Sequence, residues 1–190
     1  LAPVVKSISP EAGSINGSVE IDIEVSDNKN AKAVELYICK DSQETGELLA
    51  NVDLNKGNAK YTLDTSVYED GVYYIRAVAY DGAGNKSTET YVRRYEIDNT
   101  GISKIVLEDV TYGDTYVSLR WQDVSDEDFA YFQIEQESGG RYITVGITKD
   151  TLGYNVTGLT PLTNYSFRVV GYDVLGNRGI CSDEYSVRTK

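Results

Sequence analysis

A stretch of thirteen residues occurs twice in this chain of 190 residues, with an offset of 92. The first copy is YYIRAVAYDGAGN at residues 73–85, and the second is YSFRVVGYDVLGN at residues 165–177. Each copy alternates in side-chain character and ends in Asp-x-x-Gly-Asn, which predicts a strand followed by a tight turn. A period of 92 is too long for a solenoid repeat but fits one β-sandwich of about 100 residues. The repeat therefore predicts two domains.

The boundary between these domains is expected at Asp98-Asn99-Thr100-Gly101, four turn-forming residues between two predicted strands. We assign residues 1–98 and 102–190 to the two domains and residues 99–101 to a short linker. The chain begins at Leu1 with neither Met nor a targeting segment, so we expect a piece of a longer protein.

Strand-like alternation dominates both halves, and no segment shows sustained helical spacing of apolar residues. The 16 Tyr, 17 Gly and only 3 Pro agree with this β bias. In the first half, strands are predicted at residues 4–9, 19–25, 34–38, 48–54, 59–63, 73–80 and 90–97. In the second half, the pattern places six, at residues 117–121, 132–134, 142–147, 154–156, 165–172 and 185–189. The expected fold class is all-β, with two tandem seven-stranded β-sandwiches.

The second half carries Trp121 on its second predicted strand and LTPLTNY at residues 159–165. These features resemble the fibronectin type III family, which has a Trp on the second strand and a Leu-x-Pro-x-Thr-x-Tyr stretch before the sixth. The resemblance implies structural roles for Trp121, Pro161 and Tyr165, with the Tyr165 hydroxyl bonded to the upstream chain.

The first half resembles the immunoglobulin-like modules of bacterial surface proteins, through Asp70-Gly71-x-Tyr73 and AYDGAGN at residues 79–85. It has no Trp and no Cys pair, which excludes the antibody type. Runs of such modules resemble the spacer regions of large bacterial secreted or surface proteins, which implies an extracellular or cell-surface location. With only two cysteines, the chain is also typical of a secreted protein from a Gram-positive bacterium.

The repeated turns allow two interpretations. Asp81 with Asn85, and Asp173 with Asn177, offer oxygens that suit calcium. Alternatively, each Asp accepts backbone N–H bonds while Gly and Asn adopt positive φ. Recurrence in both domains favours the turn interpretation, in which these four residues are structural.

An interdomain calcium site is a separate hypothesis. Seven antiparallel strands put the entry and the exit of each domain at opposite poles. Asp70 and Asp98 would then face Asp126 and Asp128 across the linker. Calcium binds six or more oxygens, and the linker region supplies only one carboxylate. We therefore assign no metal and no cofactor, and keep these four residues as the alternative.

Composition excludes several functions. The net charge of −12 disfavours nucleic acid and anionic membranes, and no apolar run predicts membrane insertion. The absence of His removes the imidazole triads and the commonest zinc ligand. We expect a small sandwich to lack a water-excluding pocket and therefore predict no enzyme activity. Cys39, on an outward strand position, and Cys181 are expected to be free thiols.

The sequence thus favours a non-catalytic structural module pair, a spacer whose partners are neighbouring domains of the same chain and which is expected to be monomeric. One alternative is adhesion or carbohydrate binding, to a protein or glycan, through loops or exposed tyrosines. Another alternative is a pair of accessory domains of a secreted enzyme. The candidate tyrosines are Tyr61, Tyr68, Tyr74, Tyr80, Tyr91, Tyr112, Tyr116, Tyr131 and Tyr172.

Overall fold

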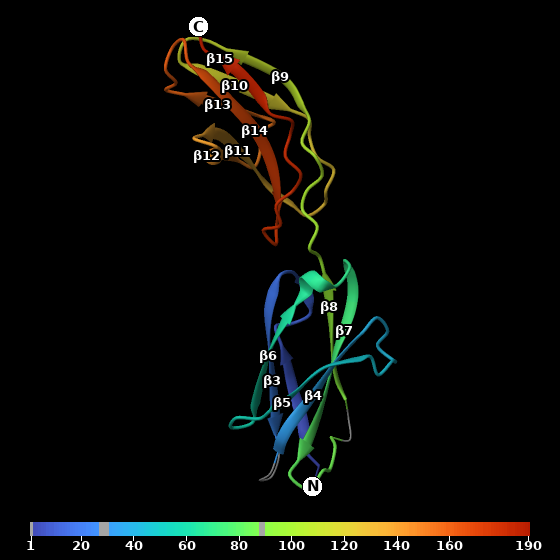
Figure 1. Cartoon of the computed structure of the whole chain (residues 1–190). Helices are drawn as coiled ribbons and strands as arrows, with labels where there is room; N and C mark the ends of the chain where they lie inside the picture. The colour runs from blue at the N-terminus through green and yellow to red at the C-terminus, as the bar shows by residue number, and fades with distance from the viewer. Residues whose placement is uncertain (1, 27–30, 88–89) are drawn as a thin grey trace. The chain divides into compact units, whose positions relative to one another are not determined.

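The computed structural model describes residues 2–26, 31–87 and 90–190, and it divides into two compact units, residues 1–99 and 100–190 (Figure 1). Each unit consists of two packed β-sheets, which confirms the all-β tandem sandwich. In the described residues the helical structure is limited to one 3₁₀ turn, Thr65–Val67. None of the described helical structure is long and apolar enough to span a membrane.

The first unit has a three-stranded sheet of order β1-β3-β6 and a five-stranded sheet of order β2-β8-β7-β4-β5. Inward-facing residues of both sheets, such as Ile21, Ile23, Leu36 and Ile75, are almost completely buried between them. The strands are β1 Val4–Ser9, β2 Gly13–Ile15, β3 Ser18–Ser26, β4 Ala31–Cys39, β5 Glu47–Asp53, β6 Asn58–Asp64, β7 Gly71–Asp81 and β8 Tyr91–Ile97.

The eight strands described in the first unit correct the prediction of seven. The additional strand is β2, which pairs in parallel with the end of β8, from Gly13↔Tyr95 to Ile15↔Ile97. Three residues are too few to show a two-residue period, so the sequence pattern could not reveal this strand. Because β1 pairs with β3, the chain changes sheets between β1 and β2.

The second unit has a three-stranded sheet of order β13-β10-β9 and a four-stranded sheet of order β12-β11-β14-β15. Its seven strands include β9, for which the sequence offered no clear pattern. Trp121 is 1% exposed, and its ring packs edge-on against Phe132 at 5.3 Å between centroids. The strands are β9 Leu107–Tyr112, β10 Tyr116–Trp121, β11 Phe129–Ser138, β12 Arg141–Thr148, β13 Gly153–Thr157, β14 Asn164–Asp173 and β15 Tyr185–Arg188.

The chain passes through each unit from one end to the other. Within the first unit, β1 starts at one end and β8 finishes at the opposite end (Figure 1). Within the second unit, the segment before β9 enters at one end, and β15 finishes at the opposite end, next to the C-terminus (Figure 1).

The residues at the two ends of the predicted linker are each fixed within one unit, Asn99 in the first and Ile102 in the second. The Asn99 N–H donates to a carboxylate oxygen of Asp70 at 2.8 Å, and the Asn99 side chain exchanges two hydrogen bonds with Thr65. In the second unit, Ile102 is 1% exposed within the core. A side chain on Gly101 would approach the Arg178 carbonyl to 2.4 Å, so glycine is required for this close contact.

Both cysteines are free, and one of them is placed differently from the prediction. Cys39 has outward parity on β4 but is buried, with its thiol 3.5 Å from the Tyr74 carbonyl oxygen. The loop after β4 covers it, because Gly46 lies directly against the Cys39 Cβ. Strand parity alone therefore misplaced this side chain.

Candidate functional site

The two repeated turns have the same hydrogen-bond geometry. In the first, one carboxylate oxygen of Asp81 accepts the N–H groups of Ala83 and Asn85, at 2.9 and 2.8 Å. The other accepts the Asn85 side-chain amide at 2.7 Å. In the second, Asp173 accepts from Leu175 and from Asn177 in the same way, at 2.9, 2.8 and 2.7 Å.

In each turn, both oxygens of the Asp carboxylate accept hydrogen bonds from N–H groups of the same turn. Hydrogen bonds from the side chain and backbone of Asn85 lower the pKa of Asp81 below its ordinary value. Gly84 and Gly176 have φ of 85° and 86°, as expected, but neither Asn is in the left-handed region. Each Asn instead directs its amide back to the Asp. Because both oxygens already accept N–H bonds, this geometry gives no support to a calcium role for the turns.

The four residues of the interdomain calcium hypothesis belong to different units. Asp70 and Asp98 lie in the first unit and Asp126 and Asp128 in the second. The Asp70 carboxylate accepts the Asn99 N–H, and the Asp126 carboxylate accepts both the N–H and the hydroxyl of Ser103, at 3.1 and 2.6 Å. The hypothesis stays a prediction.

A tyrosine anchors the corner before the repeated strand in both units. The Tyr165 hydroxyl accepts the Thr160 N–H at 3.0 Å, and Pro161 lies exposed in the intervening turn. The Tyr73 hydroxyl donates to the Glu69 carbonyl, also at 3.0 Å. The first unit therefore has a corner of the same kind, although it lacks the LTPLTNY motif.

The second unit holds a buried carboxylate on the outward face of its larger sheet. The Glu135 side chain is only 7% exposed. Arg178 donates to both of its oxygens at 2.9 Å, and Arg168 Nε donates to one of them at 2.7 Å. The Gln133 amide donates to the other at 2.9 Å. A buried charge needs such partners, because desolvation alone would disfavour it.

These donors decide the ionisation of Glu135. Burial acts to raise its pKa, but the hydrogen bonds from Arg178, Arg168 and Gln133 together outweigh burial and lower the pKa below its ordinary value. Glu135 is therefore a stable carboxylate at neutral pH.

Three tyrosines surround this cluster. Tyr131 on β11 and Tyr172 on β14 are direct cross-strand neighbours with parallel rings, 5.0 Å apart with 10° between their planes. Arg178 donates to the Tyr172 hydroxyl at 2.9 Å. The Arg168 guanidinium lies over the Tyr142 ring at 3.5 Å from its centroid. Cation–π contact at this distance fixes the plane of the guanidinium.

The first unit builds a related cluster from different donors. Glu35 on β4 accepts hydrogen bonds from the hydroxyls of Tyr37, at 2.6 Å, and Tyr80. These bonds lower the pKa of Glu35, and the bond to Glu35 raises the pKa of Tyr37 to about 12. The Lys86 ammonium lies 5.0 Å from the Tyr80 ring centroid. We call the groups around Glu35 and Glu135 the first and second carboxylate–tyrosine clusters.

Most of the tyrosines proposed for sugar stacking are partly buried. Tyr116 is exposed, at 42%, and the other eight are of intermediate burial. Tyr61, Tyr68 and Tyr91 pack against the first core, and Tyr112 packs against the second. Of these nine tyrosines, all of which lie in the described part of the chain, Tyr131 and Tyr172 form a stacked pair on an outward face.

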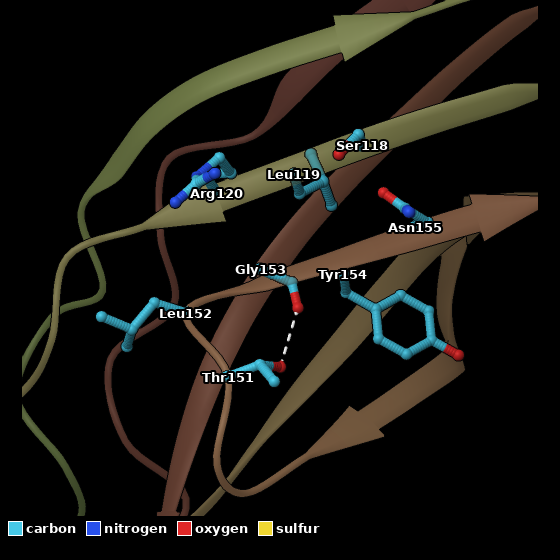
Figure 2. Close-up of a pocket in the computed structure, with 8 residues that line it drawn as sticks. All are labelled: Ser118, Leu119, Arg120, Thr151, Leu152, Gly153, Tyr154 and Asn155. Atoms are coloured by element: carbon cyan, nitrogen blue, oxygen red, sulfur yellow. Dashed lines mark hydrogen bonds between the residues drawn. The ribbon is translucent and has the colours of Figure 1, made fainter.

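Open grooves lie along the sheet faces. One, of about 380 Å³, runs over β10 and β13, where Ser118 pairs with Asn155 and Arg120 with Gly153 (Figure 2). Among its lining residues, the Thr151 hydroxyl donates to the Gly153 carbonyl at 3.0 Å (Figure 2). Arg120 is the single charged residue that lines this groove. The groove therefore lacks a pair of carboxylates for acid–base chemistry.

Sequence reasoning missed the glutamates and the cations of the two clusters. The cations could have been found, because Lys86 and Arg178 follow the repeated turns at the same offset of 92. The glutamates could not be found in this way. Their residue numbers differ by 100 and not by 92, and they do not occupy equivalent positions on the equivalent strands β4 and β11. Glu135 pairs with Arg168, whereas the residue that pairs with Arg76 is Tyr37.

No protein-family model matches the sequence, and no curated protein is significantly similar to it. Solved structures do share the fold. The chicken CNTN1 FN1–FN3 domains align with 100% of this chain and 67% of their own, at 16% identity and a TM-score of 0.58. Domains A168–A170 from titin align with 99% of this chain and 67% of their own, at 16% identity and a TM-score of 0.55. These likenesses establish a fibronectin type III or immunoglobulin-like sandwich fold.

Proposed function

We propose that the chain is a non-catalytic structural module pair, a spacer within a larger extracellular protein. The observation that carries this proposal is the path of the chain, which enters each unit at one end and leaves at the other (Figure 1). Modules with this path can be joined in series, so that each adds length between the domains on either side.

The short connection supports the same role. Asn99 is bonded to Thr65 and Asp70 of its own unit, and Ile102 is buried in the core of the next. Few residues are left to act as a free hinge. A linker held in this way limits how far two modules can swing.

The fold comparisons are consistent with this role. Both similar structures consist of consecutive domains, FN1–FN3 in one and A168–A170 in the other. Fold likeness alone does not assign function, so the extracellular and bacterial setting is proposed from the sequence resemblance and the Gram-positive source from the low cysteine content.

The absence of enzyme activity is also part of the proposal. Glu135 is paired with two arginines, and Asp81 and Asp173 are occupied by their own turns. Hydrogen bonds hold the pKa of Glu135 and of Asp81 below their ordinary values, so neither carries a proton near neutral pH that it could donate as a general acid. A role as accessory domains of a secreted enzyme stays a prediction.

The spacer can be tested with concatemers of one, two and three copies of the whole chain. Small-angle X-ray scattering should show the maximum dimension rising by a constant increment per copy. Increments that shrink with each added copy would mean that the modules fold back on one another and would refute the spacer. A variant with six Gly and Ser residues inserted after Thr100 serves as the control, since a flexible linker should broaden the distance distribution.

A further inference from the structure

We propose that the second unit binds an acidic carbohydrate, a sugar chain that carries carboxylate groups, in a groove on the outward face of β14 and β15. This binding site goes beyond the spacer function and does not depend on it. The groove measures about 430 Å³, within the range of small-molecule sites. Its lining comprises Glu137, Asn164, Tyr165, Ser166, Ser186, Val187 and Arg188.

Arg168 borders this groove, two residues along β14 from Ser166. Its Nε is held by Glu135 at 2.7 Å and its plane by the Tyr142 ring at 3.5 Å. Within the described part of the chain, no hydrogen bond involves its two terminal nitrogens, and its side chain is 28% exposed. Arg168 is therefore a pre-oriented guanidinium with a free fork of donors, which matches a carboxylate in bidentate geometry.

A second cation lies at the other end of the groove. Arg188 pairs across the strands with Asn164, four residues from Arg168, or about 13 Å at 3.3 Å per residue. Only its Nε is engaged among the described residues, by the Leu162 carbonyl at 3.1 Å. The two arginines can thus take two acidic groups of one extended ligand.

The charge on this face is less negative than that of the whole chain. Arg168, Arg178 and Arg188 are matched in number by Glu135, Glu137 and Glu184, the last of which accepts a hydrogen bond from Ser186 at 3.3 Å, whereas the whole chain carries −12. An anion is therefore repelled less by this face than by the chain as a whole.

The lining favours a sugar over an acidic peptide. The Ser166 and Ser186 hydroxyls, 2.7 Å apart, and the Asn164 amide offer both donors and acceptors to a polyol. Glu137 also lines the groove. Its carboxylate can accept hydrogen bonds from sugar hydroxyls, which the side chains of an acidic peptide do not offer. Arginines and a glutamate together therefore fit a ligand with both hydroxyl and carboxylate groups.

The test is isothermal titration calorimetry of the full chain with three probes: a hexamer of galacturonic acid, a neutral hexamer of galactose and a hexaglutamate peptide. The galacturonate hexamer should bind at least about tenfold more tightly than either of the others, as expected for charge-assisted hydrogen bonds. Equal binding of hexaglutamate would show a general polyanion surface and overturn the sugar assignment. Absence of galacturonate binding would overturn the site.

Variants locate the site. Arg188→Gln should weaken galacturonate binding about tenfold, because it removes one charged donor group. Arg168→Lys keeps the charge beside Glu135 but loses the fork, and it should weaken binding by a similar factor. Lys60→Gln removes one positive charge from the first unit, outside the lining of the groove, and should leave binding unchanged. Circular dichroism of each variant confirms folding, and wild-type affinity in both arginine variants would refute the proposal.

Discussion

The two carboxylate–tyrosine clusters each stabilise a glutamate carboxylate on the face of a sheet, but they do so with different hydrogen-bond donors. Both lie on the outward face of the larger sheet, around equivalent tyrosines, Tyr80 and Tyr172, and equivalent cations, Lys86 and Arg178. Glu35 is half-buried and accepts from two phenol hydroxyls, whereas Glu135 is buried and accepts from two guanidinium groups. The deeper carboxylate has the stronger donors.

Burial explains this difference. Neutral hydroxyls suffice where water still solvates the carboxylate, but a desolvated carboxylate needs opposite charge as well as hydrogen bonds. Arg76 and Arg168 show the same divergence, since they are equivalent in the repeat. Arg76 donates to the Ser42 and Glu44 carbonyls, while Arg168 donates to Glu135.

The largest effect is expected from removing the buried charge. Glu135→Gln leaves two arginines side by side without their anion, and it should lower the free energy of unfolding of the second unit by about 3 kcal/mol. Glu35→Gln, in the solvated cluster, should cost less than about 1 kcal/mol. Urea unfolding of the full chain can be followed through Trp121, the single tryptophan, for the second unit and by calorimetry for both. Equal losses would show that burial does not distinguish the clusters.

Exchanging the cations should give the next largest effect. Arg178→Lys replaces the bidentate contact with Glu135 by a single ammonium charge and removes the hydrogen bond to Tyr172. It should lower the free energy of unfolding of the second unit by about 1.5 kcal/mol. Lys86→Arg is the matched exchange in the first unit, where Lys86 is exposed, and it should leave stability unchanged. The same measurements decide this prediction. If Arg178→Lys leaves the stability of the second unit unchanged, the bidentate geometry of the Arg178 guanidinium contributes nothing beyond its charge.

These clusters also show how far sequence reasoning reached. The repeat located the strands, the turns and the corner tyrosines, because those features follow local rules of alternation, turn chemistry and spacing. Trp121 and Tyr165 lie where the fibronectin type III resemblance implied. Local patterns of this kind survive in a single sequence.

What sequence reasoning missed depends on pairing across strands. The glutamates do not share the offset of 92, because the segment between Glu35 and Tyr73 is eight residues longer than the segment between Glu135 and Tyr165, so no fixed period connects them. The burial of Cys39 depends on a loop that closes over it, and β2 is defined by its partner β8 rather than by its own residues. Contacts between distant segments set these features, and a sequence period cannot encode them.

The corner tyrosines should give a smaller and more equal effect. Tyr165→Phe and Tyr73→Phe each remove one hydrogen bond of 3.0 Å while keeping the ring, at a cost of about 1 kcal/mol. In Tyr165 the hydroxyl accepts and in Tyr73 it donates, so each variant leaves a different backbone group without its partner. Thermal unfolding of both variants measures the loss. If only Tyr165→Phe lowers the stability, the corner of the first unit resembles that of the second in geometry but does not contribute to stability.

The smallest effect on stability, but a specific one, is expected at alkaline pH. The hydrogen bond to Glu35 raises the pKa of Tyr37 from 10.0 to about 12, since a phenolate there would face a carboxylate. The contribution of this contact to folding is complete below pH 10. It is lost between pH 10 and 12, because in that range the unfolded phenol ionises while the native one still holds its proton.

The second cluster uses guanidinium groups in place of phenols to hold its glutamate, and the hydrogen bond to Glu135 raises the pKa of Arg178 further above its ordinary value. Phenol titration by NMR should therefore give Tyr37 a midpoint well above 10, and Glu35→Gln should bring that midpoint down, since the neutral amide removes the carboxylate charge. A Tyr37 midpoint that does not move in Glu35→Gln would show that the carboxylate is not what holds the proton. The two clusters would then differ in geometry but not in chemistry.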